Sequence, residues 1–389
     1  MKKFGKSIKN LWTLDDSVLY LNHASYGATP LRVIEAAERI QRELEREPVE
    51  FFSDKYFEQV RKVIASLAAF VGGNSYNLVL LENATTAINT VLRSLLPNIN
   101  AQDEIIITNQ TYPAVKMACR YISDVSGCKI SEVQIPYPPT CADDLINVYR
   151  NKISKRTKLV ILDHIFYTTG VINPIKEIVS FLKENDVLVL VDGAHVPGML
   201  PLNIESLGVD WYTGNCHKWL FAPKGTAFLW TAPEMQELTV PLSISYYYGQ
   251  SYTKLFDWTG TRNPSSYLAL RDAIDFHHEL GSERIFDYIH KLAAEAGDLI
   301  ASELGLAAEI PADMFGAMVS FELSDVNSKG DNFVNELRKR FFTKYRIEVP
   351  FTEFDNKVLI RFAAQIYNEL SDYERLAQAL KEFLPSIRG

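Results

Sequence analysis

The feature that most constrains the fold is a regular alternation, over residues 78–230, of short apolar segments with longer amphipathic ones. Strand-length runs followed by helix-length segments predict βαβ units and a mainly parallel sheet. Leu159–Leu162 and Val187–Val191 are apolar on both faces, as a sheet covered by helices requires. The expected strands are Leu78–Leu81, Glu104–Thr108, Lys129–Ile135, Lys158–Asp163, Val187–Asp192 and Thr226–Trp230, and the expected helices are Ala84–Leu96, Pro113–Val125, Ala142–Ile153 and Pro174–Asn185.

The pattern changes after about residue 264, where long amphipathic helices come first and isolated strands follow. This change predicts a smaller α+β domain over residues 265–389, behind a large α/β domain over residues 21–264. Residues 1–20 could join the small domain. The expected elements of the small domain are helices Ser265–Leu280, Arg284–Leu304, Asn332–Tyr345 and Asp372–Leu384, and strands Ala317–Glu322 and Val358–Phe362.

Composition excludes several functions. With 40 Lys+Arg against 48 Asp+Glu, the formal charge is −8, so we expect no general basic surface for nucleic acid. The apolar runs are far shorter than the roughly 18 residues of a membrane span, so we expect no membrane partner. Four cysteines without a C-x-x-C pair form no disulfide framework and favour the cytoplasm. His277 and His278 are neighbours that point in different directions on a predicted helix, so we expect no metal site.

Three segments carry possible chemistry. Asp192 stands at the end of a predicted strand, where open α/β sheets bind ligands, although a strand-end Asp is also a common turn residue. Lys218 lies among aromatic residues with few charges, where desolvation would make it a nucleophile; otherwise it is a surface lysine. Asn83 opens a predicted helix with Thr85 and Thr86 on its first turn, which suits a phosphate or simple capping.

An amine, an acid and an anion site are what pyridoxal 5′-phosphate requires. In these pieces the chain resembles the class V aminotransferase group of fold-type I pyridoxal phosphate enzymes, in the isopenicillin N epimerase-like and cysteine desulfurase-like branch. The resemblance covers roughly residues 19–270 and returns at 358–368. It rests on the segments Leu21–Gly27, Asn83–Asn89, Asp192–His195, His217–Lys218 and Gly260–Arg262, and on Arg361 with Tyr367 and Asn368.

The resemblance implies a role for each residue of the cofactor site. Lys218 would bond covalently to the cofactor, Asp192 would keep the pyridine nitrogen protonated, and His195 would contact the phenolic oxygen. Tyr112 would stack on the ring, with Gln110 as the competing choice. The phosphate would be held by Thr85, by the backbone of Ala84 and Thr86, and by Asn215 and His217.

The resemblance also implies roles for residues that meet the substrate or a second subunit. Arg361 would clamp the α-carboxylate of an amino acid, a task suited to a guanidinium fork. Asn22 and Ser25 would line the substrate pocket. Thr261 would reach the phosphate of the neighbouring subunit, which implies a homodimer with shared active sites.

Two departures from the family pattern bear on the reaction. No cysteine follows Cys216, whereas relatives that form a protein persulfide carry one in the C-terminal domain. Phe362 and Gln365 stand where epimerase-like relatives usually have Ser and His. The expected function is therefore isopenicillin N epimerase-like or aminotransferase-like chemistry at Cα. β-Elimination by a C–S lyase is the alternative, and a non-catalytic cofactor-binding scaffold is the rival from another class.

Overall fold

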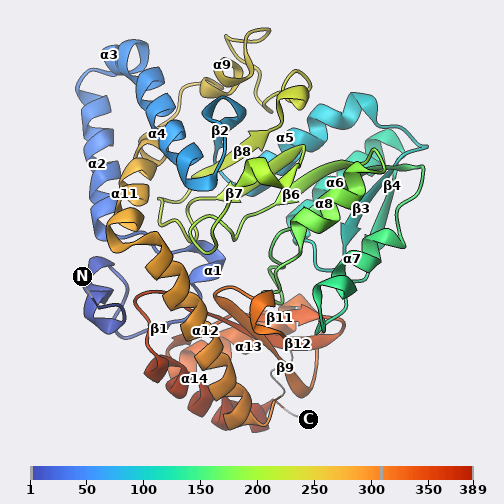
Figure 1. Ribbon diagram of the computed structural model, residues 1–389. Coiled ribbons are helices and arrows are strands. Elements are labelled where there is room, and N and C mark those ends of the chain that lie inside the picture. The colour runs from blue at the N-terminus through green and yellow to red at the C-terminus, as the bar shows by residue number, and fades with distance from the viewer. Residues whose placement is uncertain (1–2, 307–309, 388–389) are drawn as a thin grey trace.

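The computed structural model describes residues 3–306 and 310–387, and its centre is a seven-stranded mixed sheet (Figure 1). The strand order is β2-β8-β7-β6-β5-β3-β4. β3 to β7 pair in parallel, while β8 is antiparallel to both of its neighbours. The strands are β2 (Leu78–Leu81), β3 (Glu104–Thr108), β4 (Lys129–Val133), β5 (Thr157–Asp163), β6 (Leu188–Asp192), β7 (Trp211–Asn215) and β8 (Ala227–Thr231).

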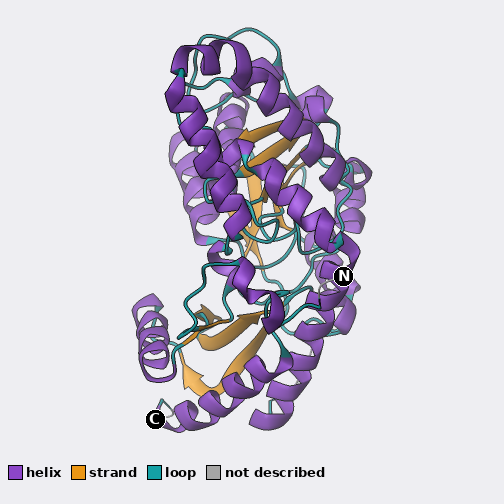
Figure 2. Ribbon diagram, turned by 90° about the vertical axis from the view of Figure 1, so that its left-hand side faces the viewer, coloured by secondary structure: helices purple, strands orange, loops and turns teal. Residues whose placement is uncertain are grey.

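Helices cover both faces of this sheet (Figure 2). Successive side chains of a strand point to opposite faces. Val160 and Leu162 accordingly join one core cluster, and Leu159 and Ile161 join the other. One face packs against α5 (Ala84–Leu95), α6 (Pro113–Ser126) and α9 (Tyr252–Asp257), and the other against α2 (Leu31–Arg46), α4 (Tyr56–Val71), α7 (Ala142–Arg150), α8 (Ile175–Lys183) and α11 (Leu270–Leu280).

The C-terminal part forms a three-stranded antiparallel sheet with order β11-β12-β9, at the bottom of Figure 1. Its strands are β9 (Met318–Asn327), β11 (Phe351–Phe354) and β12 (Lys357–Ala363), and its helices are α12 (Ser282–Leu304), α13 (Asp331–Tyr345) and α14 (Leu370–Phe383). The N-terminal β1 (Leu19–Tyr20) pairs in parallel with β10 (Ile347–Glu348), so the start of the chain contacts this part.

The predicted fold class, a large mainly parallel α/β domain with a smaller α+β domain, is confirmed. The boundary at residue 264 stays a prediction; α10 (Ser265–Leu268) and α11 pack in the core of the large sheet. Strands β7 and β11 were not anticipated from the sequence. No helix among the described residues is long and apolar enough to cross a membrane, and no described group of His, Cys, Asp and Glu could hold a metal ion.

A close backbone approach ties the short helix α1 (His23–Tyr26) to the turn after β7. Gly27 follows α1 with φ of 71°, and a Cβ placed there would lie 2.2 Å from the carbonyl oxygen of His217. No side chain can be accommodated at that distance, so the His217–Lys218 backbone would have to move.

We therefore predict that Gly27→Ala lowers the free energy of unfolding by about 2–5 kcal/mol, through backbone strain and overlap together. Gly225→Ala is the matched control, because Gly225 also has positive φ, at 81°, but nothing within 4 Å of the added Cβ. The control should cost about 1–2 kcal/mol in urea unfolding. Equal losses in the two variants would refute the close-approach argument.

Candidate active site

The site lies at one edge of the large sheet, where five strands end together. Because β8 reverses direction between β7 and β2, the carboxyl end of β2 meets the same edge as those of β3, β5, β6 and β7. A cavity of about 320 Å³ opens there. Most of the predicted site residues line it, namely Ser25, Ala84, Thr85, Tyr112, Asp192, His195, Asn215, His217, Lys218 and Arg361.

Lys218 lies in the turn after β7, with its Nζ 3.2 Å from Nε2 of His195. The pKa of Lys218 is lowered to about 8, chiefly by burial; the charge of Asp192 opposes this shift and the charge of Arg361 adds to it. Burial also lowers the pKa of His195 well below its usual range, so the imidazole is neutral. At pH 7 roughly a tenth of Lys218 is therefore unprotonated, far more than of a lysine with the ordinary pKa, and the unprotonated amine is the form that attacks an aldehyde.

The backbone of Lys218 is held by a hydrogen bond from His23. Nε2 of His23 hydrogen-bonds to the carbonyl oxygen of Lys218 at 3.0 Å, and its Nδ1 to the hydroxyl of Tyr367 at 2.8 Å. His23 is buried, and burial lowers its pKa to about 3, so it is a neutral bridge. The sequence analysis assigned it no role, although it lies within the Leu21–Gly27 motif.

Asp192 ends β6, and its Oδ1 accepts the N–H of Ala194 at 2.9 Å. Asp163 stands beside it in register at the end of β5 and also lines the cavity. Burial, followed by the charge of Asp192, raises the pKa of Asp163 well above its usual range, and burial also raises that of Asp192. Of the two carboxyl groups, Asp192 is the easier to ionise. Asp163 was missed, although it closes a predicted strand.

The start of α5 also borders the cavity, through Asn83, Ala84 and Thr85. Asn215 accepts the N–H of Ala84 at 2.9 Å, and Asn83 accepts that of Thr86 at 2.8 Å. Thr86 does not line the cavity, and Thr85 does. This differs from the expectation that the backbones of Ala84 and Thr86 serve the phosphate, because the capping bonds engage both N–H groups in the structure.

His217 also lines the cavity. Its Nδ1 bonds to the carbonyl oxygen of Thr226 at 2.9 Å, which fixes the ring. Burial lowers the pKa of His217 to about 4, so the free ring is neutral.

Arg361 reaches the cavity from β12 of the small domain and is buried. Its guanidinium donates to the carbonyl oxygen of Tyr167. Burial lowers the pKa of Arg361 to about 10, so it remains charged at neutral pH. Among the described residues no carboxylate forms a salt bridge with Arg361, and a buried guanidinium of this kind is suited to an anionic ligand.

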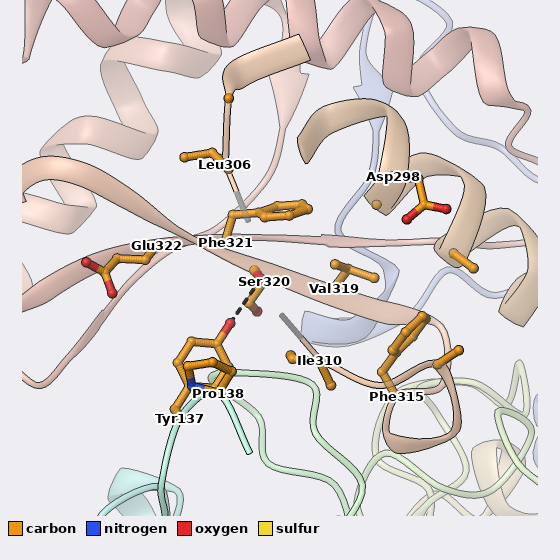
Figure 3. Close-up of a pocket in the computed structure, with 14 residues that line it drawn as sticks. Tyr137, Pro138, Asp298, Leu306, Ile310, Phe315, Val319, Ser320, Phe321 and Glu322 are labelled. Atoms are coloured by element: carbon orange, nitrogen blue, oxygen red, sulfur yellow. Dashed lines mark hydrogen bonds between the residues drawn. The ribbon is translucent and has the colours of Figure 1, made fainter. Parts of the chain in front are cut away.

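Ser320, on the strand next to Arg361, is held by two hydrogen bonds. Ser320 faces Arg361 in the β9–β12 register, and its hydroxyl donates to the carbonyl oxygen of Thr168 at 2.9 Å. The hydroxyl of Tyr137 donates to the carbonyl oxygen of Ser320 at 3.0 Å (Figure 3). A second cavity of about 400 Å³ lies here against α12 and β9, and none of the predicted site residues lines it.

Tyr112 lines the cavity with its ring centroid 5.3 Å from that of Tyr167, in an edge-to-face arrangement. Gln110, the competing choice, is buried outside the cavity and accepts the hydroxyl of Thr169 at 2.7 Å. Tyr112 is therefore the better placed of the two to contact a bound ring. Tyr167 was not anticipated from the sequence.

The remaining predicted residues lie outside the cavity. Asn22 stands behind Ser25, accepts its hydroxyl at 2.6 Å and donates to Glu348 at 3.2 Å. Thr261 is exposed in the loop before α10. Phe362 and Gln365 are both buried, and neither lines the cavity.

With this geometry established, comparison with known proteins identifies the family. Residues 19–340 match the model of the aminotransferase class-V family, so the chain belongs to that family of enzymes. It is 28% identical to an isopenicillin N epimerase of Amycolatopsis lactamdurans over 95% of this chain and 96% of the relative. It is also 28% identical to a putative L-cysteine desulfhydrase of Oryza sativa subsp. japonica over 94% and 83%, respectively.

Two further matches extend the comparison. A hercynylcysteine sulfoxide lyase of Schizosaccharomyces pombe is 26% identical over 98% of both chains. The apo structure of a cysteine desulfurase from Thermococcus onnurineus superimposes with a TM-score of 0.82 at 18% identity, covering 99% of both chains. The chain is thus an enzyme rather than a non-catalytic scaffold.

Pyridoxal 5′-phosphate is the cofactor of this enzyme, as the family and solved structures with linked cofactor indicate. The residues present fit it. Lys218 offers an amine of lowered pKa, Asp192 a buried carboxyl group, and Thr85 the first turn of a helix. These groups match the aldehyde, the pyridine nitrogen and the phosphate, respectively.

The lowered pKa of Lys218 gives a testable pH dependence. We predict that the rate at which cofactor-free enzyme incorporates pyridoxal 5′-phosphate rises with pH to a plateau, with its midpoint at a pH of about 8. The sign follows because the neutral amine predominates above its pKa. Absorbance of the bound cofactor measures the rate, and Lys218→Arg should show no covalent incorporation. A midpoint near the ordinary lysine value of 10.5 would contradict the desolvation argument.

Proposed function

We propose that the enzyme is a β-eliminating C–S lyase that acts on an L-amino acid with a sulfur substituent at Cβ. The observation that carries the proposal is the pairing of Lys218 with His195 at 3.2 Å, in a cavity that also holds Arg361. The only other described basic side chain lining the cavity is His217, and Thr226 holds it. Elimination needs a base on only one side of the substrate, which Lys218 and His195 provide. Epimerisation by two bases needs a second base on the opposite side of the Cα atom.

Two tyrosines that line the cavity are poor candidates for that second base. Burial raises the pKa of both Tyr112 and Tyr167, so their phenolates are scarce at neutral pH. Phe362 and Gln365 do not line the cavity. The names of relatives agree with this reading, because they include cysteine desulfhydrases and a sulfoxide lyase as well as epimerases.

The residues divide the reaction among them. The bound cofactor supplies an electron sink for the pair released at Cα. Arg361 holds the α-carboxylate, and Asp192 keeps a proton on the pyridine nitrogen. Lys218 takes the Cα proton at Nζ, the C–S bond breaks with its electron pair on sulfur, and Nζ returns the proton to the leaving thiolate. The unsaturated amino acid that remains hydrolyses to a 2-oxo acid and ammonia.

The cysteines favour release of sulfur directly into solution. Cys216 is fully buried, and burial raises the pKa of its thiol far above the usual value. None of the four cysteines lines the cavity. A persulfide on the protein is therefore not part of the proposed route.

We further propose that the enzyme is a cytoplasmic homodimer whose active sites are shared. Thr261 is exposed and outside its own cavity, which suits a contact with another subunit. The preceding loop carries exposed apolar side chains, among them Ile244, Tyr246 and Tyr248, which are 53%, 87% and 68% exposed. An apolar loop of this kind is typical of a contact surface.

The proposed reaction predicts particular products. Wild-type enzyme incubated with L-cysteine, L-cystine or S-methyl-L-cysteine should release pyruvate, ammonia and a sulfur product in equal amounts, and Lys218→Ala should release none. Colorimetric assays of the three products and chiral chromatography of the residual amino acid make the measurement. Formation of D-amino acid or of the 2-oxo acid without sulfur release would instead establish epimerisation or transamination.

Shared sites predict complementation between two inactive or weakened variants. Thr261→Ala removes one hydrogen bond to a charged acceptor, worth roughly 1.5–3 kcal/mol, so cofactor affinity should fall about tenfold to a hundredfold. In a mixed dimer of Thr261→Ala with Lys218→Ala, one site carries both changes and the other neither. Activity and cofactor content should then partly return. Mixed dimers that recover nothing would show that Thr261 serves its own subunit.

A further inference from the structure

Thr352 lies next to Arg361 on the small-domain wall of the cavity, and the sequence analysis gave it no role. In the β11–β12 register, Thr352 faces Leu359 and Phe351 faces Ile360, while the N–H of Arg361 donates to the carbonyl oxygen of Pro350 at 3.2 Å. Side chains two residues apart on a strand share a face. Thr352 and Arg361 are therefore diagonal neighbours on one face, close enough to contact the same small ligand.

The hydroxyl of Thr352 differs from three other hydroxyls in and near the site. Its oxygen is buried and has no hydrogen-bond partner among the residues that the structure describes. The hydroxyls of Ser25, Thr111 and Ser320 each donate to a protein oxygen. A buried hydroxyl without a partner costs about 1–3 kcal/mol, a cost that valine of the same shape would avoid. A ligand in the cavity that accepted a hydrogen bond from this hydroxyl would remove that cost.

The chemistry of that ligand follows from the donors around it. One guanidinium N–H group of Arg361 donates to the carbonyl oxygen of Tyr167. The remaining N–H groups of a charged guanidinium favour an anionic ligand. We propose that Thr352 is a substrate-binding residue whose hydroxyl donates a hydrogen bond to an oxygen of the bound amino acid. The oxygen belongs either to the α-carboxylate or to the substituent at Cβ. This inference rests on the proposed function only in taking an amino acid as the ligand.

The inference gives the small domain a part in substrate selection. If the acceptor is the α-carboxylate, Thr352 and Arg361 form one clamp, and every amino acid gains equally from the hydroxyl. If the acceptor is an oxygen on the β-substituent, Thr352 discriminates between substrates with and without that oxygen. Loss of a hydrogen bond made by a buried group is among the stronger sources of such discrimination.

The test compares the holoenzyme with Thr352→Val and Thr352→Ala, which remove the hydroxyl, and Thr352→Ser, which keeps it. L-Alanine, which has no leaving group, serves as a binding probe through the change in cofactor absorbance, and S-methyl-L-cysteine and its S-oxide serve as substrates. Thr343→Val is the matched control, because Thr343 is exposed on α13 of the same domain. Cofactor content and melting temperature check that each variant is folded.

Contact with the α-carboxylate predicts that Thr352→Val raises the Kd of L-alanine and the KM of both substrates about tenfold to a hundredfold. Contact with the β-substituent predicts a rise in KM for the S-oxide alone. In either case Thr352→Ser should stay near wild type and Thr343→Val should be unchanged. Unchanged binding of all three ligands in Thr352→Val and Thr352→Ala, or equal losses in Thr352→Ser, would overturn the inference.

The two proposals fail separately. If the wild type forms only racemised or 2-oxo products, the lyase proposal is wrong. The Kd of L-alanine and the KM values of the observed reaction still test whether Thr352 binds the amino acid. If elimination is observed and no Thr352 variant alters binding, the lyase proposal stands and the role of Thr352 falls.

Discussion

The burial of one amine, that of Lys218, is the interaction on which the rest of the site depends. An exposed lysine would be almost entirely protonated at neutral pH, and the low pKa of Lys218 exists because the protein removes water from it. Several features serve that end. His23 holds the Lys218 carbonyl, Gly27 leaves room for the turn, and a neutral His195 lies beside Nζ without adding a competing charge.

The direction of a single strand brings the start of α5 to this amine. Because β8 runs against both neighbours, β2 points the same way as β7, and α5 begins beside the end of β7. The bond from Ala84 N–H to Asn215 fixes that meeting at 2.9 Å. Were β2 antiparallel to β7, the first turn of α5 would open at the far edge of the sheet. The mixed sheet is therefore a requirement of the site and not an irregularity of a parallel fold.

Sequence patterns within a short window were enough to predict where the strands end and the helices begin around the site. Asp192 closes an apolar run, and Asn83 precedes a helical one, so strand end and helix start could be read directly. Strand β7 was not predicted because Gly214 and Asn215 have low strand propensity. Its position in the sheet is set by pairing with β6 and β8. Tyr167 and Thr352 were not predicted as site residues for a different reason. Their positions depend on pairing and on contacts with Arg361, 194 residues from Tyr167 in the sequence, which no window of sequence contains.

The two domains also interact through charge. Lys218 and Arg361 are cations in one cavity, and the charge of Arg361 is one of the causes of the low pKa of Lys218. A substrate carboxylate bound at Arg361 would offset that charge, and the pKa of Lys218 would rise. The empty cavity thus holds more of the neutral amine that attacks an aldehyde, whereas the occupied cavity stabilises the protonated amine that would result from deprotonating Cα. In the proposed reaction, an arginine that binds the substrate would thereby help the lysine to accept its proton, and binding in the small domain would be coupled to chemistry in the large one.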